Sequence, residues 1–344
     1  MTALFQELES VISKLLNTIN RKIELEKVGI IKMLDGLNWV TKFKNDVDKC
    51  TAIGVDSGFT IVETRIGVIY VIQGVAVKQT FNKSLIKIDD YHRFYDVGLI
   101  FIKPKNSSRV VRRSAYKRVL SNYAYLLELQ SVRNLLAGSA SVDIVLLDGS
   151  LLSFLVQKEF RGISVIVSSV GRGTDIEIKD LLKKKTELVN EIARTSHTVF
   201  VAKSSNAGFY TNGAYPDIYV FELAKLFRIE PYYRTGYSSP LVIEIDKTLK
   251  RFLGMVNSYD IQYFTITYSR FIDNAPIFQL TLPYKADADT VGDIFSYVRA
   301  LSPSGYPMTL EYPHRISKLS RSTVIDIFIR LGIPVVSGRE LIEL

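Results

Sequence analysis

The stretch Thr51-Ala-Ile-Gly-Val-Asp-Ser-Gly58 sets an apolar run directly before a carboxylate, a hydroxyl group and a glycine. The apolar run predicts a strand, and the glycine permits a sharp turn or the close approach of another group. We therefore expect Asp56 to lie at the end of a strand, at the rim of a sheet, where a metal-bound phosphate can reach it. The alternative is that Asp56 forms an Asx-turn before the next element.

The elements after this stretch predict the rest of the sheet. Short β-rich runs at 66–80 and 97–102 are typical of an antiparallel meander with the first strand. A long helix is predicted over 108–136. The run 142–148 is apolar almost throughout and ends in Asp-Gly, as expected of a central strand that is buried on both faces. Three strands, a helix and another strand, in this order, indicate a ribonuclease-H-like sheet.

Strands and helices continue to alternate towards the C-terminus. Further strands are predicted over 162–168, 198–202, 241–245, 263–268 and 277–282, and further helices over 175–194, 222–227, 289–301 and 317–331. The predicted class is α/β, with a mixed sheet of meander and parallel strands that helices flank.

The N-terminal segment is predicted to be an amphipathic helix. Apolar residues recur at helical spacing over 2–26, from Phe5 to Ile23, with polar residues between them. We divide the chain into this helical segment, 1–48, and a catalytic-type domain, 49–344. The helix is expected to contact a partner or a second copy of the chain, and packing within the same chain is the alternative.

Composition describes a globular protein. Hydrophobic residues make up 47% of the 344 residues, and no apolar run reaches the roughly 20 residues of a membrane-spanning helix. Cys50 is the only cysteine, which excludes an intrachain disulfide and a cysteine zinc cluster and fits a reducing compartment. The first residues lack the basic cluster of a secretory signal. We expect a cytoplasmic protein without membrane contact.

Positive charge is concentrated in one segment. The net charge is +9, and no acidic residue occurs between Val97 and Leu127. Such a local excess of cations favours contact with phosphates, although a solvated helix face is the alternative. The residues predicted to bind DNA are Lys105, Arg109, Arg112, Arg113 and Lys117.

Three carboxylates fit the chemistry of phosphodiester hydrolysis. Two divalent cations about 3.5–4 Å apart can activate water and stabilise the leaving oxygen, and Mg²⁺ or Mn²⁺ prefers oxygen ligands. Adjacent strands can present Asp56 and Asp148 at one edge of the sheet. Glu128 lies on an apolar face of the predicted helix, where a carboxylate is costly unless it is paired or bound to a metal. A surface position for Glu128 is the alternative.

The chain has three histidines, and one of them is a candidate ligand. His92 and His197 are interpreted as incidental, the first in a polar loop between strands. His314 follows a loop with two prolines and enters a basic helix. It is predicted to bind a metal or to transfer the proton of the leaving group.

These residues resemble the NurA nucleases, an archaeal family that works with the HerA translocase in processing DNA ends. The resemblance covers about residues 50–335. It rests on four motifs: Gly-Val-Asp56-Ser-Gly, Leu-Leu-Asp148-Gly-Ser, Ala-Lys203-Ser-Ser, and Gly305-Tyr306-Pro with Pro313-His314.

The resemblance implies a ribonuclease-H-like, Mn²⁺-dependent single-strand endonuclease and 5′-to-3′ exonuclease in DNA end resection and recombinational repair, forming a homodimer on a HerA-type hexameric ATPase. It implies that Asp56, Glu128, Asp148 and His314 are metal ligands, with two metals expected and Mg²⁺ as another candidate ion. Tyr306 matches a functional tyrosine, and Lys203 is implied as a phosphate or transition-state contact.

Two other functions are compatible with parts of the sequence. Val-Asp56-Ser-Gly58 also looks like the first phosphate loop of sugar kinases and actin-like ATPases, but no clear Gly-Gly adenosine motif follows Asp148-Gly149. A non-catalytic accessory subunit that binds DNA is the other alternative. It leaves the three acidic residues without a role.

Overall fold

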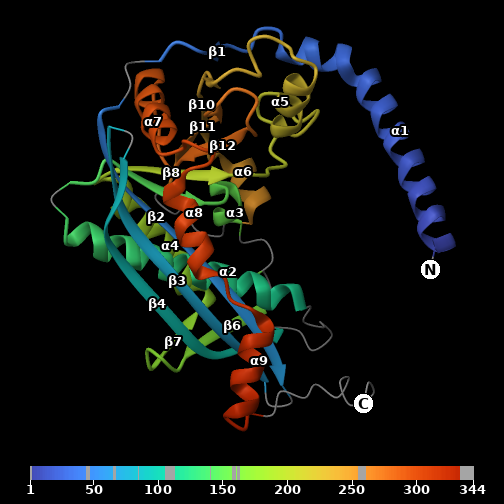
Figure 1. Cartoon of the computed structure of the whole chain (residues 1–344). Helices are drawn as coiled ribbons and strands as arrows, with labels where there is room; N and C mark the ends of the chain where they lie inside the picture. Colours follow the sequence, from blue (N-terminus) through green and yellow to red (C-terminus); the bar gives the residue numbers. More distant parts are fainter. Residues whose placement is uncertain are drawn as a thin grey trace.

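Helices flank one mixed sheet in the computed structural model of the chain (Figure 1). The structure describes residues 2–43, 47–64, 67–83, 85–104, 113–139, 141–156, 160, 163–254 and 261–333. The strands are β1 (Trp39–Val40), β2 (Lys49–Thr64), β3 (Gly67–Asn82), β4 (Leu85–Pro104), β5 (Ile144–Asp148), β6 (Ile163–Ser169), β7 (Thr174–Glu177), β8 (His197–Ala202), β9 (Gly236–Ser238), β10 (Leu241–Glu244), β11 (Tyr263–Arg270) and β12 (Phe278–Leu282). The helices are α1 (Thr2–Leu34), α2 (Arg113–Ala137), α3 (Leu151–Leu155), α4 (Ile178–Ala193), α5 (Asp217–Leu226), α6 (Lys247–Leu253), α7 (Ala288–Ala300), α8 (Met308–Ser317) and α9 (Arg321–Arg330).

The sheet has the predicted ribonuclease-H-like centre. Its described strands follow the order β1-β9-β11-β12-β8-β5-β2-β3-β4-β6-β7, and β10 pairs with β11. β2, β3 and β4 form the predicted antiparallel meander, while β5 lies parallel to both β2 and β8. The mixed α/β class predicted from the sequence is therefore confirmed.

β5 is apolar because both of its faces are buried. Val145 and Leu147 contribute to the core beneath α2, α3 and α4, whereas Ile144 and Leu146 belong to the core that includes α7. Successive side chains of a strand point to opposite faces, so a strand between two helical layers needs apolar residues at every position. Helix α8 packs along β2 and β3.

The N-terminal helix is confirmed and is longer than predicted. α1 continues to Leu34, and its N-terminal part extends away from the sheet (Figure 1). Ile30 and Leu34 are buried at its C-terminal end, where Tyr232 Oη donates a hydrogen bond to Leu34 O. β1 then pairs with β9, so the N-terminal segment also contributes a strand to the sheet. The domain boundary at residue 48 stays a prediction.

The prediction that a strand ends at Asp56 is wrong. β2 runs through Asp56 and Gly58 without a turn and pairs with β3 along its whole length. The glycines serve the close approach of α8 instead: a Cβ atom on Gly54 would lie 1.9 Å from Thr309 O, and one on Gly58 would lie 2.3 Å from Ser317 O. The missing side chains make room for a helix rather than for a turn.

The loop predicted before His314 is also wrong, because His314 lies within α8. Pro313 is tolerated inside this helix although proline lacks the N–H that would bond to Thr309 O, four residues earlier. The Thr309 carbonyl lies against Gly54, where it has room. The predicted helix over 317–331 is interrupted after Ser317, since Lys318 has an extended backbone, and α9 starts at Arg321.

Two smaller predictions need correction. His92 lies in β4 and not in a loop, and its ring contacts Ser131 Oγ of α2 at 3.2 Å. Residues 174–177 form β7, a strand paired with β6, so α4 begins at Ile178. Both segments contain several polar residues because they lie near the exposed end of the sheet.

A search of the described helices for a membrane span is negative: none of them combines the length and the apolar character that crossing a bilayer requires.

Candidate metal centre

Asp56 and Asp148 are neighbours because β2 and β5 are parallel and in register. Val55 pairs with Leu147, so the next residue on each strand is a carboxylate. Adjacent strands lie about 4.8 Å apart, which is close enough for two carboxylates to share a cation. The order of the strands predicted that Asp56 and Asp148 lie side by side. The pairing register of β2 and β5 places them so.

His314 completes a three-residue group with these carboxylates. Its Nδ1 atom lies 2.8 Å from Asp56 Oδ2, and the side-chain exposures are 45% for His314 and 16% for Asp56. One possible ligand atom from each of Asp56, Asp148 and His314 lies within 4.8 Å of the other two. We call these three residues the metal-ready group.

Helix α8 positions His314 through several contacts with the meander. Ser317 Oγ donates a hydrogen bond of 3.0 Å to Asp56 Oδ2, and Gln73 Nε2 of β3 donates to Ser317 O at 3.3 Å. Together with the close approach at Gly54 and Gly58, these bonds fix α8 along β2. The position of His314 therefore depends on how this helix packs on the sheet.

Glu128 is buried on α2, with 7% of its surface exposed, and its Oε1 atom accepts a hydrogen bond from Ser57 Oγ. Burial and the negative charge of Asp56 raise its pKa to about 8, although the bond from Ser57 lowers it. Burial also raises the pKa of Asp56, while hydrogen bonds from His314 and Ser317 oppose that shift. The site holds more carboxylates than its surroundings neutralise.

Lys203 and Tyr306 lie beside the metal-ready group. Lys203 Nζ donates a hydrogen bond of 3.2 Å to Asp148 Oδ2 and lies 4.5 Å from the centre of the Tyr306 ring. The Tyr306 hydroxyl is buried and has no hydrogen-bond partner among the described residues. Burial, and then the charges of Asp148 and Asp56, raise the pKa of Tyr306. This hydroxyl is a free donor close to the carboxylates.

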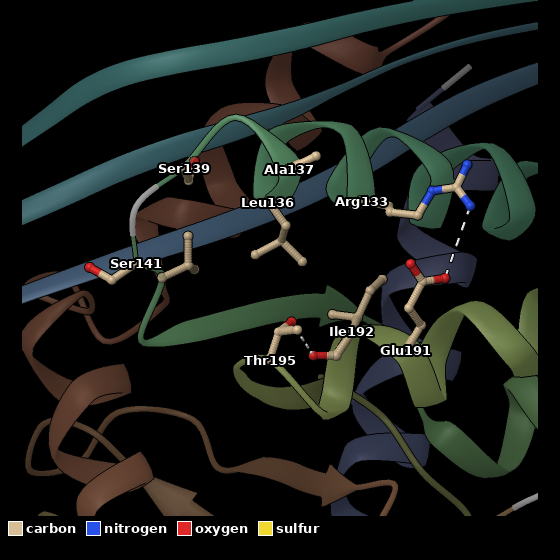
Figure 2. A pocket seen from close by; sticks show the side chains of 9 residues that line it. Arg133, Leu136, Ala137, Ser139, Ser141, Glu191, Ile192 and Thr195 are labelled. Carbon is tan, nitrogen blue, oxygen red and sulfur yellow. Dashed lines mark hydrogen bonds and ion pairs between the residues drawn. The ribbon is translucent and has the colours of Figure 1, made fainter.

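A hollow of about 230 Å³ opens at the carboxylates. It is lined by Asp56, Ser57, Phe59, Ser121, Ala124, Tyr125, Glu128, Asp148 and Gly149. A larger hollow of about 320 Å³ lies at the opposite end of β5, where Leu136 of α2 faces Ile192 of α4 (Figure 2). It has one acidic residue, Glu191, which lies 4.0 Å from Arg133. The smaller hollow is the one that is equipped for metal chemistry.

The basic segment can be placed only in part. Lys105, Arg109 and Arg112 lie outside the described residues. Arg113 is the first residue of α2, although its side chain is not described, and Lys117 is exposed on the same helix. The helix that carries Glu128 into the site therefore starts in the basic segment.

Three residues of the site were not predicted from the sequence. Ser57 holds Glu128, Ser317 holds Asp56, and Tyr125 lines the hollow. Ser57 directly follows Asp56 in the chain, and this position indicates that it lies close to the site. Ser317 lies three residues after His314, one turn along α8, whereas the sequence predicted a loop before His314 and a helix that starts at residue 317.

The donor set fits a divalent cation. Carboxylate oxygens suit Mg²⁺ and Mn²⁺, and an imidazole beside them favours Mn²⁺, because Mg²⁺ prefers oxygen ligands throughout. A nearby cation stabilises the charged form of a buried carboxylate whose pKa is raised. Asp56, Asp148 and His314 can bind an ion directly, and Glu128 adjoins them through Ser57.

Fold and site together define a ribonuclease-H-like α/β protein with an acidic, histidine-containing centre at the junction of its parallel and antiparallel strands. The NurA domain model matches residues 50–319. The chain therefore belongs to the NurA family.

Solved structures agree with this assignment. The NurA nuclease from Sulfolobus solfataricus is 16% identical, with a TM-score of 0.64 and coverage of 96% of both chains. A NurA structure with manganese is 11% identical, with a TM-score of 0.57, and covers 93% of this chain and 97% of its own. Another, bound to dAMP and manganese, is 12% identical, with a TM-score of 0.55, and covers 92% and 94%. At these identities the likeness shows the fold. Curated protein sequences give no significant match.

Proposed function

We propose that the protein is a metal-dependent nuclease that hydrolyses phosphodiester bonds of DNA. The observation that carries the proposal is the metal-ready group, in which Asp56, Asp148 and His314 offer ligand atoms within 4.8 Å of one another. Membership in the NurA family supports it, as do the related structures with manganese and with dAMP and manganese. Mn²⁺ is the proposed cofactor, and a second ion bound with the help of Glu128 is part of the proposal.

The residues of the centre have distinct roles in the proposed reaction. A bound divalent ion supplies Lewis acidity at the phosphate and makes water a better nucleophile near neutral pH. Asp56 and Asp148 would hold that ion, and His314 would either ligate it or transfer a proton at Nδ1. Lys203 is proposed to exchange its bond to Asp148 for one to a phosphate oxygen, and the buried Tyr306 hydroxyl is a candidate donor to the nearby carboxylates.

Finer features of the proposal rest on the family resemblance. They are single-strand endonuclease and 5′-to-3′ exonuclease activity, a role in DNA end resection and recombinational repair, and action together with a HerA-type hexameric ATPase. Co-purification of tagged protein with such an ATPase, before and after removal of α1, tests the partnership.

The direct test of the proposed function is incubation of the purified protein with end-labelled single- and double-stranded DNA. We expect cleavage with Mn²⁺ and none with EDTA, and the labelled end gives the polarity. ATP hydrolysis is measured beside it, since a sugar-kinase-like or actin-like protein would hydrolyse ATP. Intact DNA together with ATP turnover would reject the nuclease in favour of the ATPase.

Binding of Mn²⁺ is expected to release protons near neutral pH. Glu128 has a pKa of about 8, so it is mostly protonated at pH 7 and must lose its proton to serve as a ligand. Titration calorimetry in two buffers of different ionisation enthalpy measures the release. We expect about one proton fewer from Glu128→Gln than from the native protein. Equal release from both would contradict the role of Glu128.

The same shift predicts how pH affects the metal-free protein. The pKa of Glu128 is raised in the folded state, so its contribution to stability is complete below the ordinary value of 4.5 and is lost as pH rises towards about 8. Metal affinity should change in the opposite direction and increase over this range.

The basic segment before and at the start of α2 is proposed to bind DNA phosphates. Replacing Arg112 and Arg113 together with alanine should weaken DNA binding and flatten its dependence on salt by about two charges. Fluorescence anisotropy at several salt concentrations measures the slope, and Lys247→Ala, at an exposed residue of α6, is the control. An unchanged slope would show that the segment does not contact phosphates and is a solvated helix face.

The exposed face of α1 is proposed to bind a second copy of this chain. Large apolar side chains that are 41% to 76% exposed lie along α1: Phe5, Leu8, Val11, Ile12, Leu15, Leu16, Ile19, Leu25, Val28 and Ile31. A helix of 33 residues is about 50 Å long, which is enough for a self-complementary interface.

Replacing Leu8 and Leu15 with glutamate should convert this dimer into monomers, because it buries charges in the apolar interface. Light scattering after size exclusion measures the mass, and Lys14→Gln on the same helix is the control. A dimer that survives the double replacement, or a native protein that is monomeric, would reject the exposed face of α1 as the dimer interface.

A further inference from the structure

A lysine is buried among apolar residues behind the metal centre. Lys185 belongs to α4 and has no exposed surface, while Lys183 and Lys184 just before it are exposed. The buried positions of α4 include 178, 181, 182, 185, 188, 189 and 192, so Lys185 occupies the middle of the apolar stripe. An amino group at such a position is costly, and burial lowers the pKa of Lys185 to about 7.

The contacts of Lys185 connect two segments that lead to the metal centre. Its Nζ atom donates a hydrogen bond of 2.5 Å to Asn122 Oδ1 of α2 and another to Phe154 O of α3. It also lies 4.0 Å from the centre of the Phe154 ring and 5.9 Å from that of Tyr125. None of its contacts in the described part of the chain is with a carboxylate. Lys185 therefore joins two helices and does not neutralise an acid.

Helix α2 carries the candidate ligand Glu128, and α3 follows shortly after Asp148, the last residue of β5. Asn122 lies on α2 six residues before Glu128, and Tyr125 lies between them. Helix α3 starts two residues after Gly149, which directly follows Asp148. Gly149 has a φ of +103°, and a Cβ atom there would lie 2.8 Å from Tyr125 Oη. The Tyr125 and Phe154 rings meet edge to face at 5.4 Å. The wall formed by Tyr125, Gly149 and Phe154 thus separates Lys185 from the carboxylates.

We propose that Lys185 is a positioning residue, which holds α2 against α3 so that Glu128 and Asp148 keep the separation that metal binding requires. The inference rests on the proposed function and deepens it. Two hydrogen bonds to two different helices define a fixed geometry, whereas an apolar residue in this place would allow the helices to slide. Support of this kind behind metal ligands is commonly worth about 10–100-fold in metal affinity or activity.

The test compares Lys185→Met with Lys184→Met, the same replacement on the solvent side of α4. Methionine fills the space of lysine without its amino group, and the relief of burying that amino group offsets the two hydrogen bonds that are lost to Asn122 and Phe154. We expect Lys185→Met to keep its Tm, to bind Mn²⁺ about tenfold more weakly and to show a kcat about tenfold lower, with KM for DNA within about twofold. Lys184→Met should resemble the native protein.

Calorimetric Mn²⁺ binding without DNA is the readout that does not depend on activity. Native Mn²⁺ affinity and kcat in Lys185→Met would overturn the inference, even if its Tm changed. If that variant does not fold, Asn122→Leu removes the acceptor on α2 and is expected to weaken Mn²⁺ binding and kcat in the same way; native values would again overturn the inference. Failure of the native protein itself to bind Mn²⁺ and cleave DNA would instead overturn the proposed function.

Discussion

Asp56→Ala and Asp148→Ala are each expected to lower Mn²⁺-dependent DNA cleavage by at least about 10³-fold, because each removes an anionic ligand from the metal-ready group. The fold should persist, since both side chains lie at the hollow and not in either core. Cleavage of end-labelled DNA under single-turnover conditions measures the loss.

The stability of Asp56→Ala separates the loss of a ligand from unfolding. Burial raises the pKa of Asp56, so its charged form is unfavourable in the metal-free protein. Its removal should change the Tm of that protein only slightly, because the relief of burying the charge offsets the hydrogen bonds lost to His314 and Ser317. Mn²⁺ should no longer raise the Tm. Asp175→Ala, at an exposed carboxylate on β7, is the control. A folded Asp56→Ala protein that cleaves DNA at the native rate would show that the metal centre is assigned to the wrong residues.

Gly54→Ala is expected to have the second largest effect. The new Cβ atom would lie 1.9 Å from Thr309 O, and this contact is with backbone, which cannot rotate away as a side chain can. Overpacking of this kind typically costs about 1–3 kcal/mol. Helix α8 would have to move, and His314 and Ser317 would move with it, away from Asp56. We expect a lower Tm and a loss of cleavage that exceeds the loss of stability.

Gly29→Ala is the matched control for this replacement. Gly29 lies inside α1 with nothing within 4 Å of a Cβ atom, and alanine is the better helix former. Chemical denaturation and cleavage rates compare the two variants. Native stability and activity in Gly54→Ala would mean that α8 does not pack on β2 as closely as the structure has it.

The central strands could be predicted because local sequence determines them. The run before Asp148 is apolar at every position since β5 is buried on both faces, and that pattern identified a central parallel strand. The pairing of β2 with β5 followed from the order of the elements, and it placed Asp56 beside Asp148.

The packing of α8 could not be predicted, because it is a contact over about 250 residues of sequence. Gly58 indicated a turn when only local rules were applied, whereas Gly54 and Gly58 both accommodate α8, at Thr309 and Ser317. Pro313 indicated a loop for the same reason. The contacts that position His314 and Glu128 are likewise non-local, and no periodicity in the sequence indicates them.

The buried position of Lys185 is encoded in the helical period of its sequence. Its spacing from Leu181, Leu188 and Ile192 places it on the buried stripe of α4. Lys185 ends a run of three lysines, and only the helical register distinguishes it from the exposed Lys183 and Lys184. The helix period therefore carries more information here than the local charge.

Anomalous diffraction from crystals soaked in MnCl₂ tests the central claim most directly. We predict a manganese peak bounded by the carboxylates of Asp56 and Asp148 and the imidazole of His314, and the loss of this peak in Asp56→Ala crystals soaked in the same way. Manganese bound elsewhere in the native protein, with Asp56, Asp148 and His314 left without an ion while the same preparation cleaves DNA, would contradict the account.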